Sequence, residues 1–352
     1  MFLHLLCAVL MGSAALSVAA SGGFSEYSDV NRVLFVHPRS SAVAGGDLAF
    51  RRDGRTGTPA SNLALDAPAQ LDLSYTGYYR NLFSVSGLGY VASLDAGQAI
   101  GVSLGYLLVP AIQLTTGLET DYEGNPVFDP SRIQYASMSE FEGGFSYGRG
   151  LVLPSSVRLG LGGTISLTRR KLPDSDGRHV AGYGIGVDVS VSAAFDNPGI
   201  RGVLLVENAT GSHVSYADEG YTHRGYPHVR VGLGWERDVD YFSGDVRVVY
   251  ATPDLLSREG ANARSLPDRV HGGSEPRELA LTRDPQFLLY GSLGAQVSFA
   301  GRVTVRGGIR EARDPVFGAG LTLPGKQLHI DIAYLHHTLD GSYSAALSWQ
   351  WH

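Results

Sequence analysis

Three short motifs carry residue types that could perform chemistry. Residues 101–105, Gly-Val-Ser-Leu-Gly, have the spacing of a hydrolase nucleophile elbow, which presents its serine on a sharp turn between a strand and a helix. His336 and His337 offer two adjacent imidazoles, and imidazole is a common metal ligand. Residues 208–210, Asn-Ala-Thr, fit the acceptor pattern for N-linked glycosylation. Each motif works only in a particular local structure, so the elements around it decide its meaning.

The elements expected around the first two motifs argue against catalysis and metal binding. Ser103 lies within a run in which apolar and small residues alternate, as in a β-strand, so no strand-to-helix turn presents it as a nucleophile. The same alternation would place His336 and His337 on opposite faces of a strand, with no acidic or histidine partner at ligand spacing. We therefore expect no catalytic residue, no metal site, no cofactor and no enzyme. A lipid hydrolase built on Ser103 is the least favoured alternative.

The charge pattern gives no sign of nucleic-acid binding. The net charge is −6, and the basic residues do not gather into a patch. Acidic residues do gather in one loop-like stretch, at Glu119, Asp121, Glu123 and Asp129, and a mixed-charge stretch runs from Ser257 to Arg283. We interpret both stretches as solvated surface, with contact to a protein partner as the minority alternative.

The clearest strand pattern runs from Ser342 to His352, where an apolar row alternates with small polar residues. Similar alternation recurs along the chain and predicts fourteen strands, near residues 70–76, 83–93, 98–108, 137–148, 155–167, 181–193, 199–207, 227–236, 244–251, 286–299, 302–310, 315–322, 327–336 and 342–352. The second run slips register near Gly87, which predicts a β-bulge there. No helical pattern is available to cover the apolar rows, so we expect lipid to cover them.

The connections and the glycines support a transmembrane barrel. The connections after the third, fifth, seventh and ninth strands are long, at about 109–136, 168–180, 208–226 and 252–285, whereas those after the even-numbered strands are short. Outer-membrane barrels have this asymmetry between their two ends. Glycine makes up 46 of the 352 residues, about twice its usual share, which suits a crowded or curved inner wall. A barrel implies bacterial export, so we expect no glycan at Asn208.

The first 68 residues differ from the rest. Residues 1–20 are free of charged side chains and end in small residues, which predicts a signal peptide cleaved near Ala20. Cys7, the one cysteine, falls inside that peptide, so no disulfide is expected in the mature chain. Residues 21–68 do not alternate and contain short apolar pieces between Gly, Ser, Pro and charges. We expect them to fold against something else, and we assign residues 69–352 to the barrel.

Four segments carry a resemblance to a known family. They are SSAVAGG at 40–46, TPASNLAL at 58–65, LDLSYTGYYRNLFSVSGLGYV at 71–91 and the terminal hairpin from Ile330 to Trp351. With them the chain resembles the PorV/PorQ family of outer-membrane proteins, which is related to the FadL-type long-chain fatty-acid transporters. The resemblance implies an all-β, fourteen-stranded antiparallel transmembrane barrel with an N-terminal hatch at residues 21–68.

The resemblance also points to particular residues. The family usually has Asn-Pro-Ala in its hatch where this chain has Thr58, Pro59 and Ala60, so only the roles of Pro59 and Ala60 carry over directly. Asn62 belongs to the same expected hatch motif. At the other end, the resemblance implies that Trp349 and Trp351 form the aromatic signal that the barrel-assembly machinery reads, with His352 a tolerated extension.

The function expected from this reading is passage or binding of hydrophobic small molecules, such as long-chain fatty acids, across the outer membrane of a double-membraned bacterium. An apolar ligand would leave water for a pocket between hatch and wall, and movement of the hatch would open the route. The alternative is a barrel without a channel that serves as a scaffold for a secreted protein, with the long outer loops making the contacts.

Overall fold

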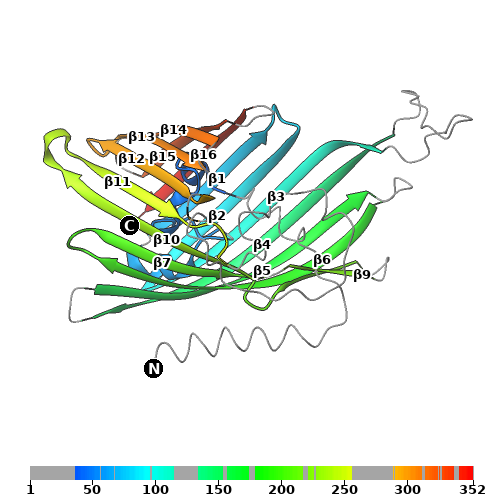
Figure 1. Cartoon of the computed structure of the whole chain (residues 1–352), viewed down its shortest axis with the longest axis horizontal. Coiled ribbons are helices and arrows are strands. Elements are labelled where there is room, and N and C mark those ends of the chain that lie inside the picture. The colour runs from blue at the N-terminus through cyan, green and yellow to red at the C-terminus, as the bar shows by residue number, and fades with distance from the viewer. Residues whose placement is uncertain are drawn as a thin grey trace, which may run out of the picture.

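The computed structural model of this chain describes residues 36–351, apart from 56, 67, 96, 115–133, 154–156, 174–178, 217–220, 226, 256–287, 289, 311–313, 324, 326 and 337–340. Residues 1–20, assigned above to a signal peptide, lie outside the described part. Within the described part, fourteen antiparallel strands close into one ring, which confirms the predicted barrel (Figure 1).

The ring follows the order of the chain. Its strands are β1 (Ala69–Tyr78), β2 (Phe83–Asp95), β3 (Gln98–Leu114), β4 (Gln134–Val152), β5 (Val157–Pro173), β6 (His179–Phe195), β7 (Ile200–Glu207), β10 (His228–Val239), β11 (Gly244–Ala251), β12 (Ser292–Phe299), β13 (Val303–Arg310), β14 (Asp314–Thr322), β15 (Leu328–Leu335) and β16 (Ser342–Trp351). Each strand pairs with its neighbours in sequence around the ring, and β1 pairs with β16, from Ala69 opposite Trp351 to Gly77 opposite Tyr343. Closure leaves no unpaired edge in the ring itself.

Two further strands form a hairpin outside the ring. β8 (Ser212–Tyr216) pairs with β9 (Tyr221–Gly225) and also with β6, where Ser215 lies opposite Tyr183. This hairpin falls within 208–226, a stretch predicted to be a loop. It forms because β6 is 17 residues long while β7 pairs with it only from Val189 to Phe195, so the outer part of β6 has an edge that β8 can occupy.

The expected bulge at Gly87 is absent. Pairing of β2 with both of its neighbours is continuous at Gly87, and the one irregularity of β2 lies between Ser93 and Asp95. A Cβ on Gly87 would lie 2.3 Å from Nη1 of Arg55. Glycine at this position leaves room for the guanidinium group of an arginine from the N-terminal segment, and the strand does not bend there.

The two faces of the strands separate as predicted. In β16, Tyr343, Leu347 and Trp349 are exposed, whereas Ser342, Ser344 and Ser348 are buried. In β15, Ile332 is 55% exposed between Asp331 and Ala333, which are both buried. The apolar rows thus face outward around a closed barrel, which is how a barrel meets lipid.

The two ends of the barrel differ. The longest connections, after β3, β7 and β11, lie at one end, which we call the outer end, and every connection at the other end, after β2, β4, β6, β10, β12 and β14, is short. The stretch 168–180 was predicted to be a long loop, but β5 extends to Pro173 and β6 begins at His179, so only residues 174–178 connect them. One short turn holds the 3₁₀ turn η4 (Asp240–Phe242). β3, β4, β5 and β6 have 17, 19, 17 and 17 residues, more than the roughly ten needed to cross a membrane at a tilt. These four strands reach beyond β12–β16 at the outer end (Figure 1).

Residues 36–66, here called the interior segment, lie inside the ring (Figure 1). The segment contains α2 (Pro38–Ser41), η2 (Gly46–Ala49) and α3 (Ala60–Asp66). α2 begins with Pro38 in its first turn and His37 as N-cap, whose Nδ1 accepts from the backbone N–H of Arg39 at 3.1 Å. No helix in the described part is both long and apolar enough to cross a membrane.

Candidate functional site

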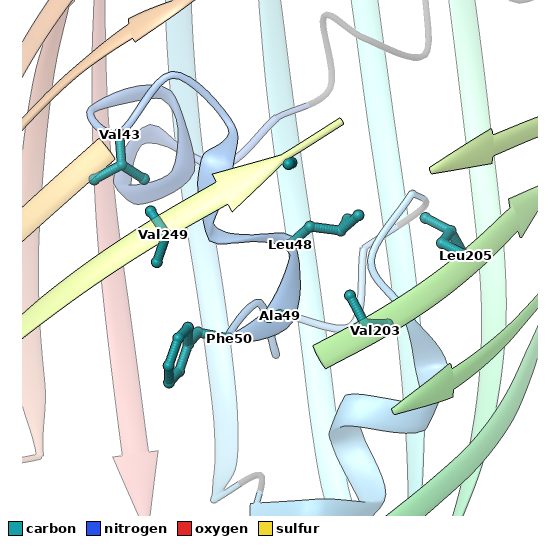
Figure 2. Packing of buried hydrophobic residues seen from close by; sticks show 8 residues of the cluster. Val43, Leu48, Ala49, Phe50, Val203, Leu205 and Val249 are labelled. Atoms are coloured by element: carbon teal, nitrogen blue, oxygen red, sulfur yellow. The ribbon is translucent and has the colours of Figure 1, made fainter. Parts of the chain in front are cut away.

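The interior segment contacts almost the whole circumference of the wall. α2 lies against β14, β15, β16 and β1; η2 against β7, β10, β11 and β12; and α3 against β3, β4, β5 and β6. Figure 2 shows one of these contacts, in which Leu48 and Phe50 of the segment pack with Val203 on β7 and Val249 on β11. A short segment with three small helical pieces therefore touches strands around most of the barrel wall.

Wall glycines form the seat of α3. A Cβ on Gly160 of β5 would lie 2.2 Å from the carbonyl oxygen of Ser61, and one on Gly162 would lie 2.3 Å from the Ser61 nitrogen. Gly148 of β4 meets the Ala60 carbonyl oxygen in the same way, at 2.2 Å. Real Cβ atoms do not approach so closely, so a side chain at any of these three positions would displace the helix. The glycine content of the chain is explained in part by this backbone-to-backbone packing.

Buried charges join the segment to the wall on the opposite side. Asp331 of β15, whose side chain is 2% exposed, accepts from Nη2 of Arg39 at 3.0 Å and from Nη1 of Arg306 at 2.6 Å. The Asp331 carboxylate raises the pKa of the Arg39 guanidinium above its usual value. The free-energy cost of desolvating this carboxylate is offset by its two guanidinium partners, and only while both are in place.

Smaller polar contacts continue around the ring. His37 places Nε2 3.5 Å from the Asp72 carboxylate on β1, and Nη1 of Arg55 donates to Ser74 Oγ at 2.6 Å. On α3, the hydroxyl of Ser61 lies 2.5 Å from that of Ser192 on β6. The segment is thus held by separate polar contacts spread over several strands, and none of them is a covalent link.

The predicted hatch motif forms the start of α3 and the loop before it. Thr58 is 3% exposed and donates through Oγ1 to the Asp53 carboxylate, while the Pro59 carbonyl oxygen accepts from the Asn62 backbone N–H at 2.9 Å. Ala60 packs against Gly148 and Gly162. Thr58, which stands where the resembling family has Asn, therefore has a hydrogen bond of its own within the segment.

Asn62 makes the most connections of this motif. Its Nδ2 donates to the carbonyl oxygens of Leu48 and Arg51, at 2.9 and 3.0 Å, and its Oδ1 accepts from Ser192 Oγ at 2.6 Å. One side chain therefore ties α3 to the loop after η2 and to the wall. Any role of Thr58, Pro59, Ala60 and Asn62 in transport stays a prediction.

A cavity of about 500 Å³ lies between the interior segment and the wall. It is lined by charged residues, by polar residues and by a few apolar ones: His37, Arg39, Ser40, Val43, Asp47, Phe50, Arg51, Arg52, Asp53, Pro68, Gln70, Asp72, Arg201, Glu236, Arg247, Val249, Gln296 and Gln350. Two guanidinium carbons lie close to the centroid of the Phe50 ring, that of Arg201 at 5.1 Å and that of Arg247 at 4.5 Å. This is the place at which the sequence predicts a pocket for an apolar ligand. The lining is mainly polar, because the residues that fix the segment to the wall are charged.

An apolar cluster occupies the inner wall toward the outer end. Tyr78, Val85 and Leu107 are buried there, with Tyr79, Phe83 and Met138 packed around them. The rings of Tyr78 and Phe83 stack at 4.7 Å. We call these six residues the outer-end cluster. Strand alternation missed Tyr78 and Leu107 because each lies next to another apolar residue, Tyr79 or Leu108, and such pairs do not show which member faces inward.

The other motifs do not assemble into a site. Ser103 lies in the middle of β3, 4% exposed, so it has no nucleophile elbow. No group of three or more metal-ligating side chains occurs among the described residues. Asn208 is buried in the turn after β7, and His336 directly follows β15. His337, the acidic stretch at 119–129 and residues 257–283 lie outside the described part.

The two tryptophans expected to guide assembly lie on the last strand. Trp349 is 55% exposed and faces outward. The Trp351 ring stacks on Tyr90 of β2 with 5.9 Å between centroids. Recognition of either residue by assembly machinery stays a prediction.

The fold and the packed lumen define the class of this protein: a closed, fourteen-stranded membrane β-barrel with an N-terminal segment inside it. Its sequence matches no protein-family model and no curated protein. Several solved barrels are similar to it in structure. They include the P. putida toluene transporter TodX (TM-score 0.47, 10% identity, 84% of this chain and 93% of that chain covered), a Pseudomonas aeruginosa FadL homologue (0.48, 11%, 90% and 98%) and the monoaromatic hydrocarbon channel CymD (0.49, 12%, 91% and 98%). These likenesses are remote, and the resemblance to the PorV/PorQ family stays a prediction.

Proposed function

We propose that this protein is an outer-membrane channel for small hydrophobic molecules, in which the interior segment forms the described part of a hatch at residues 21–68. The observation that carries the proposal is the outer-end cluster. The inner wall of a water-filled porin is polar. Here Tyr78, Val85 and Leu107 point inward at the end that would face the outside of the cell.

The outer-end cluster suits the capture of an apolar molecule. Aromatic and aliphatic side chains at that end would remove the apolar surface of such a molecule from water, at about 25 cal/mol for each Å² buried. Long-chain fatty acids and small hydrocarbons both have the necessary surface. We favour long-chain fatty acids or compounds of similar length, and identification of a lipid or apolar ligand that co-purifies with the protein would name the substrate directly.

The interior segment is the barrier along this route. Below the outer-end cluster, α3 rests directly on wall glycines, and the contact between Ser61 and Ser192 leaves no passage at that point. The 500 Å³ cavity lies beside the segment and would form the rest of the path once the segment shifts. Transport in this proposal therefore requires the segment to move relative to β5 and β6.

A reversible lock tests that requirement. The two serine hydroxyls lie within 2.5 Å of each other, so Ser61→Cys with Ser192→Cys places two thiols where a disulfide can join the hatch to the wall. The only natural cysteine, Cys7, falls in the predicted signal peptide. We expect the oxidised double variant to lose uptake of a long-chain fatty acid by cells that carry it in an intact outer membrane, and a reductant to restore uptake.

The single variants Ser61→Cys and Ser192→Cys are the matched controls, since each introduces a thiol without the cross-link. They should transport equally with and without oxidant. Equal uptake by the oxidised and reduced double variant would show that the segment does not move at α3. Absence of uptake by the unmodified protein would contradict the channel itself.

A scaffold for a secreted protein is the second candidate. The observation that favours it is the extension of β3–β6 and the β8–β9 hairpin at the outer end, which forms a wall longer than the membrane needs. In this case a secreted protein would co-purify with the barrel. Cells carrying the Ser61→Cys, Ser192→Cys double variant would take up no fatty acid, whether the disulfide is oxidised or reduced. Truncation of the hairpin at 212–225 would then release the partner, whereas a channel would keep its ligand.

A further inference from the structure

The outward face of β5 changes character toward the outer end. Ile165 and Leu167 are exposed and apolar, at 51% and 60%, and the next two outward residues, Arg169 and Lys171, are exposed and cationic. We call these two residues the cationic rim. Along the outward face of β5, two apolar residues are therefore followed, toward the outer end, by two cationic residues.

The neighbouring strands add aromatic rings and no opposing charge. Arg169 lies opposite Phe141 of β4 and Tyr183 of β6, with its guanidinium carbon 5.9 Å from the centre of the Tyr183 ring. The partners of Lys171 are Ser139 and Ala181. Phe141 and Tyr183 are exposed, at 44% and 59%. Aromatic side chains at this level are typical of the boundary between hydrocarbon and headgroups.

The nearby carboxylate of β4 faces the other way. Glu140 is 2% exposed inside the barrel and accepts from Nε of Arg170 at 2.6 Å. Arg170 and Arg169 are adjacent in a strand, so they point to opposite faces, and the buried pair uses the inward carboxylate. Among the described strand residues that flank the cationic rim, the outward face therefore carries positive charge without a neighbouring acid.

From this arrangement we propose that the outward face of β4–β6 binds a phosphate-bearing membrane lipid of the outer leaflet. The acyl chains lie along Ile165, Leu167 and Ile185, and a headgroup phosphate bridges Arg169 and Lys171. Arginine and lysine bind phosphate through charge-assisted hydrogen bonds, and both can extend from an apolar surface to the headgroup level. This site is independent of the lumen and of the proposed transport.

Native mass spectrometry of the full mature chain in detergent tests the site, with bisphosphorylated lipid A as the probe. The double variant Arg169→Ser with Lys171→Ser should bind this lipid roughly thirtyfold more weakly than the unmodified protein, because two charges near a headgroup are lost. The exchange variant Arg169→Lys with Lys171→Arg keeps both charges and should retain binding. Arg149→Ser is the matched control, since Arg149 is an exposed cation toward the short-turn end of the neighbouring strand β4.

Two further probes separate the headgroup from other sources of binding. Dephosphorylated lipid A should bind as weakly to the unmodified protein as intact lipid A binds to the double variant. Inorganic phosphate alone should not bind measurably, because the acyl contacts are missing. Unchanged lipid binding by the double variant, an equal loss in Arg149→Ser, or equal binding of the dephosphorylated lipid would overturn the proposal. The proposal would also be overturned if the exchange variant lost lipid binding but still gave the heat-resistant band of a folded barrel in gel electrophoresis.

Discussion

Arg39 donates to Asp331 at 3.0 Å, and this contact joins the interior segment to β15 across 292 positions of the chain. The same carboxylate also receives Arg306 from β13. The barrel wall therefore provides one arginine for Asp331 and the interior segment provides a second. Asp331 therefore keeps both of its arginine partners only while the segment is in place.

Replacement of Asp331 by Asn should destabilise the barrel by roughly 3 kcal/mol, because the buried Arg306 and the half-buried Arg39 both lose their carboxylate. Arg39→Gln should cost less, since Arg306 still faces Asp331 and the Arg39 side chain is 34% exposed. Urea unfolding followed by the fluorescence of Trp235, Trp349 and Trp351 measures both. An Asp331→Asn protein as stable as Arg39→Gln would show that Arg306 does not need this carboxylate.

A methyl group at Gly162 should expel α3 from its seat. The Cβ of Gly162→Ala would lie 2.3 Å from the Ser61 nitrogen, and overpacking of this kind costs about 1–3 kcal/mol. We expect higher conductance in planar bilayers as well as lower stability. Gly163→Ala is the control on the next residue, where the nearest atom is the Asp188 carbonyl oxygen at an ordinary 3.5 Å. Equal conductance of the two variants would refute the role of the glycine seat.

The interior segment should loosen in acid through Asp47. Burial alone raises the pKa of Asp47, but Arg51 and a hydrogen bond from Ser40 Oγ at 2.7 Å outweigh burial and hold the pKa below its ordinary 3.8. Because the pKa of Asp47 is lower in the folded state than in the unfolded state, its carboxylate stabilises the fold at pH values above the ordinary pKa. This stabilisation is lost as the pH falls through the lowered pKa of the folded state.

Removal of the Ser40 hydroxyl tests that linkage. Ser40→Ala should reduce the free energy of unfolding by roughly 1–2 kcal/mol at pH 7, and the difference from the unmodified protein should shrink below about pH 4. Asp47→Asn should abolish this part of the pH dependence. Urea titrations at pH 7, 5 and 3 measure all three proteins, and a Ser40→Ala effect that stays the same at every pH would exclude the linkage.

Arginine at Ile332 should report which face meets lipid. Ile332 lies mid-strand in β15 and faces outward, so Ile332→Arg should cost roughly 2–4 kcal/mol if the residue is near the membrane midplane. Ile332→Leu should change little. The free energy of folding into lipid vesicles is the measurement, and a cost near zero for the arginine would place this position in water.

The sequence determined the barrel because the side chains of a strand alternate between its two faces, so a strand with lipid on one side alternates between apolar and polar residues. The apolar row of Tyr343, Leu347 and Trp349 needs no tertiary information to show that one face of β16 differs from the other. Closure into a ring follows once many such strands occur without helices to cover them. Unequal connections then separate the two ends.

Only the tertiary structure decided what the inner face does. Alternation marks Gly162 and Asp331 as inward, but it does not show that one supports Ser61 and the other binds Arg39. It did not show that the pocket expected to receive an apolar ligand has a mainly polar lining, and it missed the outer-end cluster and the β8–β9 hairpin. The contacts of Gly162 with Ser61 and of Asp331 with Arg39 join residues far apart in the chain, and their positions are set by how the ring closes around its first segment.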